Sequence, residues 1–231
     1  MKTKINHFYG NQEDLDLQIV KLTLDLESSQ ESEALENGWL IYNDVWYNSR
    51  SSRINVEEYR PQSTNKYLKK YTFLYQNKFF LSDEVIDVYT KFITIKKFNK
   101  TYKIDTDLDR SCGVFVYNND THNLVAYTKM VKYDGGIESQ FAVWDYSEPK
   151  ASIGRVIIDY EVEAVKKLGY KYLYIGPVYG INSTYKLNIN GFEWWDGEKW
   201  NTDQHELFKL LDRDTRIKSL EDLSDAFIQD S

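Results

Sequence analysis

The residues best suited to contact a ligand gather in one stretch, "GPVYGINSTYKLNINGFEWWDG", which covers positions 176–197. It combines aromatic side chains, glycines that let the backbone approach another group closely, and one lysine, Lys186, which directly follows Tyr185. Two interpretations are open. The stretch is either a tightly packed corner of a core or the floor of a pocket, where aromatic faces and backbone groups meet a ligand.

Basic residues are concentrated in the middle of a chain that is acidic overall. The net charge is −7 over 231 residues. Residues 59–192 hold 19 Lys and Arg against 14 Asp and Glu, whereas each flank carries a charge of −6. Two stretches, 60–72 and 91–103, carry four and five basic residues and no acidic residue. Such stretches either hold phosphate groups or form solvated faces, and both interpretations are open.

The common catalytic and metal-binding sets are missing from the sequence. The one cysteine, Cys112, lies among apolar residues and is expected in the core, without a disulfide or a cysteine-rich metal site. His7, His122 and His205 are scattered, and none receives a role. We expect no metal and no other cofactor. The first residues lack the apolar run of a signal peptide, and no run of about eighteen apolar residues occurs. We therefore expect a cytoplasmic protein that does not contact membranes.

The apolar periodicity predicts an α+β fold with a division after residue 80. In the first part, residues 1–80, it indicates two strands, an aromatic hairpin between them and a helix with one basic face. That face would carry Lys66, Lys69 and Lys70. The predicted elements are a strand over 17–25, a hairpin over 38–48, a strand over 52–59 and a helix over 64–77.

The second part, residues 81–231, contains the order strand, strand, strand, helix, strand. A helix that is capped by Ser82 precedes it, and a short helix, a hairpin about Asp196-Gly197 and acidic C-terminal helices follow it. Gly169 fits the position just past a helix end. The predicted elements are a helix over 82–95, strands over 112–118, 123–133 and 137–146, a helix over 153–168, a strand over 171–176 and a short helix over 181–189.

This order of elements resembles the GNAT acyltransferase fold, in which three antiparallel strands precede a helix whose N-terminus faces the cofactor phosphates. The resemblance implies a GNAT-like mixed sheet flanked by helices, with a smaller N-terminal α/β region packed against it. The GNAT signature at the helix start is Arg/Gln-x-x-Gly-x-Gly/Ala. The corresponding turn here, "KASIGR", has one glycine, Gly154, so the acyl-CoA signature is missing. The N–H groups at this helix start would still suit an anion.

Two stretches resemble the arginyl-tRNA–protein transferases and their bacterial leucyl-transferring relatives. In "NDVWYNSRSSRINVEEYRPQSTNKYLKKY", positions 43–71, the family order Arg-Ile-x-Val-x-x-aromatic-x-Pro is followed. Further on, "WDYSEPKASIG" and "KYLYIGPVYGINSTYK" resemble the family's turn before a helix and its Tyr-Tyr-Leu-Gly stretch that ends in Tyr-Lys. The match covers roughly 38–71 and 112–190. The family's cysteine cluster is missing from "YNSRSS", and its Lys-Met pair is missing before Tyr185.

The resemblance implies that an aminoacyl group moves from the 3′ ester of a charged tRNA to an amine. The tRNA is the co-substrate, and the acceptor is a protein N-terminus, a peptide or a small amine. Because the ester is already activated, the protein must hold both partners, keep the amine neutral and stabilise the oxyanion. Neither a covalent nucleophile nor a metal is required.

The resemblance also assigns roles to residues. Phosphate contacts are expected from the basic middle of the chain, and Lys186 is expected to hold the oxyanion, the ribose or a phosphate. Asp145 is expected to take a proton from the amine or to hold a cationic donor side chain. Aromatic faces are expected to bind the terminal adenosine. The tRNA contacts are Arg53, Arg60, Lys66, Lys69 and Lys70; the catalytic residues are Asp145, Tyr185 and Lys186; the substrate contacts are Tyr179, Asn182, Ser152, Arg155 and Trp194.

Simpler roles stay open for several of these residues. Arg53 could pair with a carboxylate, Asp145 and Ser152 could only cap their turns, and Lys186 could be a surface lysine. Trp194 and Trp195 point to opposite faces of one strand, so at least one of them is expected in the core. Two other functions compete with tRNA-dependent transfer: N-acylation from acyl-CoA by a GNAT enzyme, and binding of tRNA or protein ends without catalysis.

Overall fold

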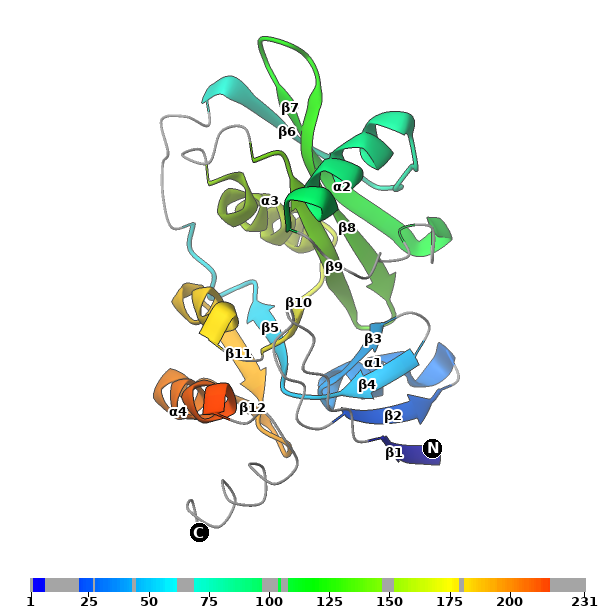
Figure 1. The fold of residues 1–231 in the computed structure, drawn as a ribbon. Helices are drawn as coiled ribbons and strands as arrows, with labels where there is room; N and C mark the ends of the chain where they lie inside the picture. The colour runs from blue at the N-terminus through cyan, green and yellow to red at the C-terminus, as the bar shows by residue number, and fades with distance from the viewer. Residues whose placement is uncertain are drawn as a thin grey trace. The chain divides into compact units, whose positions relative to one another are not determined.

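The computed structural model describes residues 2–6, 21–26, 28–42, 45–61, 69–96, 104, 108–146, 152–178 and 181–216 (Figure 1). The chain forms two compact units. One unit comprises Met1–Ile54 and Ile175–Ser231, and the other comprises Asn55–Tyr174. We call them the outer unit and the central unit, after their places in the sequence. The division after residue 80 stays a prediction.

The central unit is built on a sheet with the order β10-β9-β8-β7-β6. Strands β6 to β9 are antiparallel neighbours, as the sequence predicts for the three strands from residue 112 on. A strand that follows a helix, β10, pairs in parallel with β9. The bounds are β6 (Tyr71–Gln76), β7 (Ser111–Asn118), β8 (Leu124–Tyr133), β9 (Gly136–Trp144) and β10 (Tyr172–Pro177).

Two helices cover opposite faces of this sheet. Helix α2 (Asp83–Lys96) packs its apolar residues into a core that includes Tyr127 of β8. Helix α3 (Ile153–Lys167) reaches the next residue of β8, because Glu161 accepts a hydrogen bond from Thr128. Neighbouring residues of a strand point to opposite faces, so α2 and α3 lie on different sides. This mixed sheet flanked by helices confirms the predicted α+β class, and its element order is GNAT-like.

The parallel contact between β9 and β10 is short. It consists of two residue pairs, Leu173 with Ile137 and Tyr174 with Glu138. Strand β9 continues beyond Glu138 to Trp144 while it stays paired with β8. The rest of β10, from Ile175 on, belongs to the outer unit.

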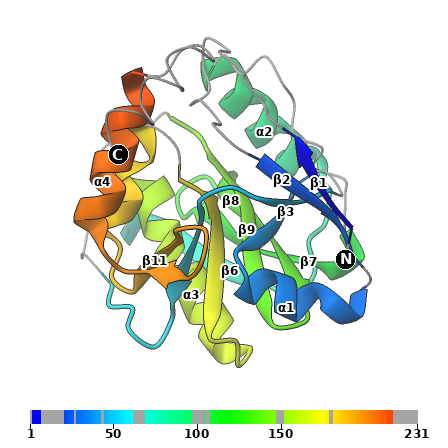
Figure 2. The ribbon, with the colours of Figure 1, turned by 90° about the horizontal axis from the view of Figure 1, so that it is seen from below.

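The outer unit contains a four-stranded sheet in the order β1-β2-β4-β3. Its strands β3 and β4 form the predicted aromatic hairpin, with Trp39 opposite Asn48. Helix α1 lies beside β3 (Figures 1 and 2). The bounds are β1 (Lys2–Asn6), β2 (Lys21–Asp25), the 3₁₀ helix η1 (Ser28–Gln30), α1 (Glu31–Glu36), β3 (Trp39–Tyr42) and β4 (Val45–Asn48).

A second group of strands in the outer unit pairs β11 with β5 and with β12. Strands β11 and β12 form the predicted hairpin about Asp196-Gly197, and Gly197 has a φ of 111° that favours glycine. The predicted short helix is a 3₁₀ helix, η5. The bounds are β5 (Ser51–Asn55), η5 (Ile181–Asn188), β11 (Phe192–Trp195), β12 (Trp200–Asn201) and α4 (Gln204–Arg216).

The predicted helix over residues 64–77 is wrong for its described part, from residue 69 on. Residues 71–76 form strand β6, and Lys69 and Lys70 lie in a 3₁₀ turn just before it. The sequence "YTFLYQ" is rich in strand-forming residues, and β7 supplies the hydrogen-bonding partner that a local pattern does not reveal. Phe73 stacks on Tyr160 of α3, with ring centroids 4.1 Å apart. Residues 62–68, including Lys66, lie outside the described residues.

Candidate functional site

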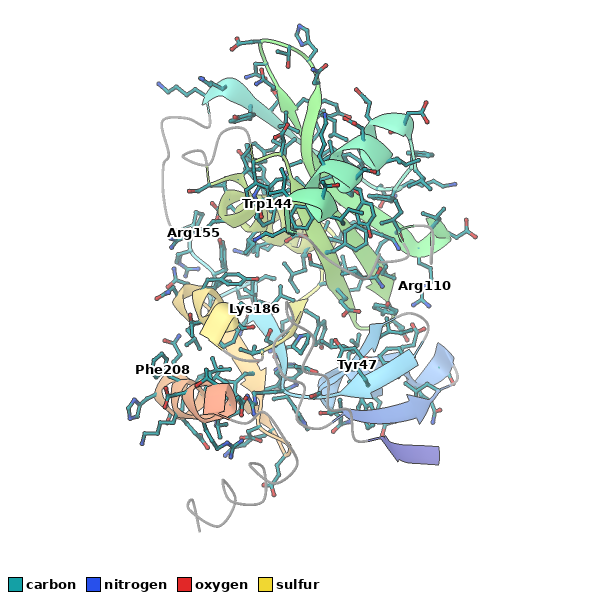
Figure 3. All side chains as sticks on the ribbon, in the orientation of Figure 1. Tyr47, Arg110, Trp144, Arg155, Lys186 and Phe208 are labelled. Atoms are coloured by element: carbon teal, nitrogen blue, oxygen red, sulfur yellow. The ribbon has the colours of Figure 1, made fainter. Side chains whose placement is uncertain are left out.

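The start of α3 rests on an indole ring. A Cβ atom at Gly154 would lie 2.9 Å from two ring carbons of Trp144, the last residue of β9 (Figure 3). The glycine is therefore needed for the helix to pack against the end of β9. This is a packing role.

Ser152 enters α3 in an unusual conformation. Its φ is 52°, in the left-handed region that few non-glycine residues adopt. Its carbonyl oxygen accepts the N–H of Arg155 at 2.9 Å and that of Val156 at 3.2 Å. Its hydroxyl makes no capping hydrogen bond, so the simple capping role for this side chain is wrong. The side chains of Ser152 and Arg155 are both exposed.

Asp145 follows Trp144 at the end of β9 and is half-buried. Its N–H donates to the carbonyl oxygen of Val125 at 2.8 Å, which extends the ladder to β8 by one residue. Beside it, Tyr146 lies 5.4 Å from the Trp144 ring, and the ammonium of Lys96 lies 5.3 Å from the Tyr146 ring. Trp144 and Tyr146 pack against the core beneath α2, and Lys96 is exposed at the end of that helix.

One hydrogen bond to α3 inside the central unit was not expected from the sequence. The hydroxyl of Tyr59 donates a short hydrogen bond to Asp159. Burial and this bond raise the pKa of Tyr59 well above its usual range. Burial raises the pKa of Asp159, while the Tyr59 bond and the charge of Arg155 partly offset that increase. The contact ties the turn after β5 to α3 inside the central unit, next to exposed Arg155.

A carboxyl group of α3 lies buried where the helix faces strands β8 and β9. Glu161 is 2 % exposed, and it accepts hydrogen bonds from Ser139 at 2.7 Å and from Thr128. Burial raises the pKa of Glu161 to about 7, against the lowering effect of the two hydroxyl groups. The only sign of this group in the sequence is a charged residue at a helix position where an apolar residue is expected. Ser139 directly follows the last residue of β9 that pairs with β10.

In the outer unit, Lys186 turns inward and Tyr185 turns outward. The ammonium of Lys186 donates to the carbonyl oxygens of Ile175 at 2.7 Å and Pro177 at 2.8 Å (Figure 3). Lys186 is 8 % exposed, whereas Tyr185 is 59 % exposed. Lys186 is therefore a buried lysine that binds the backbone, and the surface role that the sequence left open for it is wrong.

Arg53 and Trp194 lie in the packed interior of the outer unit. Arg53 forms an ion pair with Glu193 at 2.6 Å, and its guanidinium lies 4.0 Å from the ring centre of Trp200. Trp194 and Trp195 are both buried, which confirms that at least one belongs to the core. The indole N–H of Trp194 donates to Asp203 O at 3.1 Å. In "NGFEWWDG" the aromatic residues are therefore core, while Asn190 and Gly197 at its ends are exposed, and "GPVYGINSTYK" carries exposed Tyr185.

The other basic candidates in the central unit are exposed. Arg60 donates to the carbonyl oxygens of Glu57 and Tyr59, and its side chain faces solvent. Lys69 and Lys70 are exposed, while their carbonyl oxygens accept hydrogen bonds from Asn119. Tyr179, Lys66 and the side chain of Asn182 lie outside the described residues. The convergence of Lys66 and Lys70 with Tyr179 and Tyr185 stays a prediction.

Two properties of the described residues bear on metals and membranes. Among these residues, no group of three or more His, Cys, Asp or Glu side chains could hold a metal ion. Within the same part of the chain, no helix is long and apolar enough to cross a membrane.

Comparisons with known proteins show similarity only at the level of three-dimensional structure. No family model and no curated protein matches the chain. A solved structure of L-PGS from Bacillus licheniformis matches 70 % of this chain and 63 % of its own, with 12 % identity and a TM-score of 0.46. The C-terminal domain of a protein described as a lysylphosphatidylglycerol synthetase, from Agrobacterium fabrum, is a second match. It covers 60 % of this chain and 49 % of its own, with 9 % identity and a TM-score of 0.45.

A GCN5-related N-acetyltransferase from Kribbella flavida is also similar in structure. It matches 55 % of this chain and 47 % of its own, with 12 % identity and a TM-score of 0.39. The chain thus spans between about half and two thirds of the length of the solved structures that it matches.

Proposed function

We propose that the protein is an aminoacyltransferase that moves an amino acid from a charged tRNA to an amine. The observation that carries the proposal is the start of α3. The GNAT-like order of strands and helices is present, but the single glycine there, Gly154, packs against Trp144. A GNAT-like protein without the glycine-rich phosphate turn needs another activated acyl donor, and the two motif stretches resemble transferases that use charged tRNA.

The reaction needs positioned groups more than a reactive one. The neutral amine attacks the carbonyl carbon of the 3′ ester, and the carbon–nitrogen bond forms as the bond to the ribose oxygen breaks. The amine loses a proton, and the departing ribose oxygen gains one. Asp145 at the end of β9 is the group that we assign to the amine proton. Exposed Tyr185 is the face that we assign to the terminal adenosine.

The tRNA backbone is assigned to exposed basic residues of the central unit. Arg60, Lys69, Lys70 and Arg155 all reach solvent. Contacts of such side chains to phosphates give an affinity that falls with salt and does not depend on base sequence. The acceptor is a protein N-terminus, a peptide or a small amine. The missing cysteine cluster separates this chain from relatives that modify proteins beginning with Asp or Glu.

A transfer assay with charged tRNA tests the proposal. Bulk tRNA charged with one labelled amino acid at a time is mixed with the protein, a set of peptides that differ in their first residue, and small amines. We expect label to appear in an amide product for at least one amino acid. No transfer with any of them would refute catalysis from tRNA. Saturable binding of acetyl-CoA in calorimetry would then favour the acyl-CoA alternative, and RNA that copurifies without turnover would favour a binding protein.

Two charge-reversal variants test the assigned tRNA surface. Lys69→Glu/Lys70→Glu should raise the KM for charged tRNA about tenfold and lower the salt dependence of binding by about two phosphate contacts. Lys166→Glu/Lys167→Glu is the matched control, because these two adjacent lysines are also exposed and lie in the last turn of α3. Equal effects of the two pairs would contradict the assignment of Lys69 and Lys70.

A further inference from the structure

Side chains bind three successive carbonyl groups at the end of β10. Lys186 donates to Ile175 O and Pro177 O at 2.7 and 2.8 Å. Between them, the hydroxyl of Ser52 donates to Gly176 O at 2.6 Å. In a sheet, carbonyl groups of this kind usually accept N–H groups of neighbouring strands. Here one ammonium and one hydroxyl satisfy them.

The alternation of the strand shows which edge Lys186 occupies. The N–H of Val178 donates to Arg50 O at 2.9 Å, so Gly176 and Val178 direct their backbone groups to that side. The carbonyl oxygens of Ile175 and Pro177 accept from Lys186, whereas that of Gly176 accepts from Ser52 of β5. Pro177 has no N–H to offer a further strand. Lys186 thus binds two carbonyl groups that backbone N–H donors of a neighbouring strand would otherwise bind.

The ammonium lies beside the backbone of Gly176, and its approach does not require the absence of a side chain there. Gly176 has a φ of 75°, and a Cβ atom there would lie 3.9 Å from Nζ of Lys186. The lysine is 8 % exposed, so its charge is stabilised by carbonyl dipoles in place of water. The next residue back, Tyr185, is 59 % exposed. In a 3₁₀ helix successive side chains are about 120° apart, which explains why one points inward and the other outward.

We infer that Lys186 is a positioning residue, whose ammonium replaces a neighbouring strand at the end of β10. It fixes η5 on the strand end, so that Tyr185 is held toward solvent. Lys186 then acts on the substrate through Tyr185 and does not itself contact the oxyanion or a phosphate. The part about Tyr185 rests on the proposed function, whereas the clamp on β10 does not.

Hydrogen–deuterium exchange of the full chain tests the clamp without any substrate. Lys186→Met keeps the length of the side chain and removes its donors, which leaves two carbonyl groups without them. We expect the amides of Val178 and Ile189 to exchange about 10- to 100-fold faster, because their hydrogen bonds lie in the clamped segment. Lys186→Arg retains a charge and several donors and should stay near the wild-type rate. Lys209→Met, on the exposed side of α4, is the control.

The outcomes separate the two possible roles. Wild-type exchange at Val178 and Ile189 in Lys186→Met would overturn the inference, and a loss of transfer in that variant would then indicate direct contact with the substrate. If Lys186→Met does not fold, Lys186→Gln and Ser52→Ala remove donors in smaller steps, and unchanged exchange in both would also overturn it.

An activity measurement adds the link to Tyr185. Where transfer is measurable, Tyr185→Ala and Lys186→Met should both raise the KM for charged tRNA, while Lys186→Arg restores it. A large fall in kcat alone in Lys186→Met would contradict the positioning role. If the wild type transfers nothing, the proposed function fails, and the exchange result still decides whether Lys186 clamps β10.

Discussion

Replacing Glu161 with glutamine should make the free energy of unfolding less dependent on pH. Burial raises the pKa of this carboxyl group from 4.5 to about 7, so the folded chain holds its proton more tightly than the unfolded chain does. Each pKa unit corresponds to about 1.4 kcal/mol, so ionised Glu161 costs about 3 kcal/mol of folding stability. Below pH 4.5 both states are protonated and the cost is absent. It grows as the pH rises from 4.5 to 7 and is complete above 7.

Glu161→Gln removes the ionisation but keeps the shape and an oxygen that accepts a hydrogen bond from Ser139 or Thr128. At pH 5 the variant should therefore be more stable than the wild type by no more than about 1 kcal/mol. At pH 8 the variant should be more stable by up to about 3 kcal/mol. Urea unfolding at pH 5, 6, 7 and 8 measures this, since all other titrating groups are common to both proteins and cancel in the difference.

The control is Glu163→Gln on the same helix. Glu163 is exposed and pairs with Lys167 at 2.7 Å, so its loss should cost less than about 1 kcal/mol. A difference between wild type and Glu161→Gln that stays constant from pH 5 to 8 would refute the reasoning, as would a wild type that gains stability relative to the variant with rising pH.

Three further substitutions test the packing. Gly154→Ala would place a methyl group 2.9 Å from ring carbons of Trp144, and we expect a loss of about 1–3 kcal/mol in urea unfolding. Gly169→Ala adds a methyl group in open space at a φ of 81°, so the loss should be backbone strain alone, about 1 kcal/mol; a larger loss than for Gly154→Ala would contradict both. Arg53→Met breaks the buried pair with Glu193 and should cost about 3 kcal/mol, most of which Arg53→Met/Glu193→Met should recover in the same assay.

The order of elements from β7 to β10 could be predicted because the local sequence pattern of each element indicates its type. Helix α3 has an apolar stripe and ends before Gly169, whose φ of 81° suits its place just past the helix. The helix expected over 64–77 failed for the same reason. Tyr71 and Leu74 fit a helical spacing, but β6 forms its hydrogen bonds with β7, about forty residues further along the chain, and that partner leaves no mark in the local pattern.

The sequence shows which residues of the candidate site are suited to contacts, but it does not show which partners they contact. Tyr185 and Lys186 stood out as an aromatic and a cationic residue in a neutral stretch. Nothing in the stretch shows that one is exposed while the other binds the carbonyl groups of Ile175 and Pro177. Glu161 drew no attention, because a glutamate in a helix is usually solvated. Its partner Ser139 lies on another strand, and only the fold brings the two together.

Burial divides the basic residues that the sequence singled out into two groups with different consequences. Arg53 and Lys186 are buried inside the outer unit. Arg53 forms an ion pair with a carboxylate, and Lys186 donates hydrogen bonds to backbone carbonyl groups. Arg60 and Lys70 keep their charges at the surface of the central unit. Phosphates compete poorly for a charge that is already desolvated and bound, because the internal contact would have to break first. Substitution of Arg53 or Lys186 should therefore change the free energy of unfolding and hydrogen exchange more than it changes tRNA affinity. Substitution of Arg60 or Lys70 should change the salt dependence of tRNA binding, while the free energy of unfolding stays within about 0.5 kcal/mol.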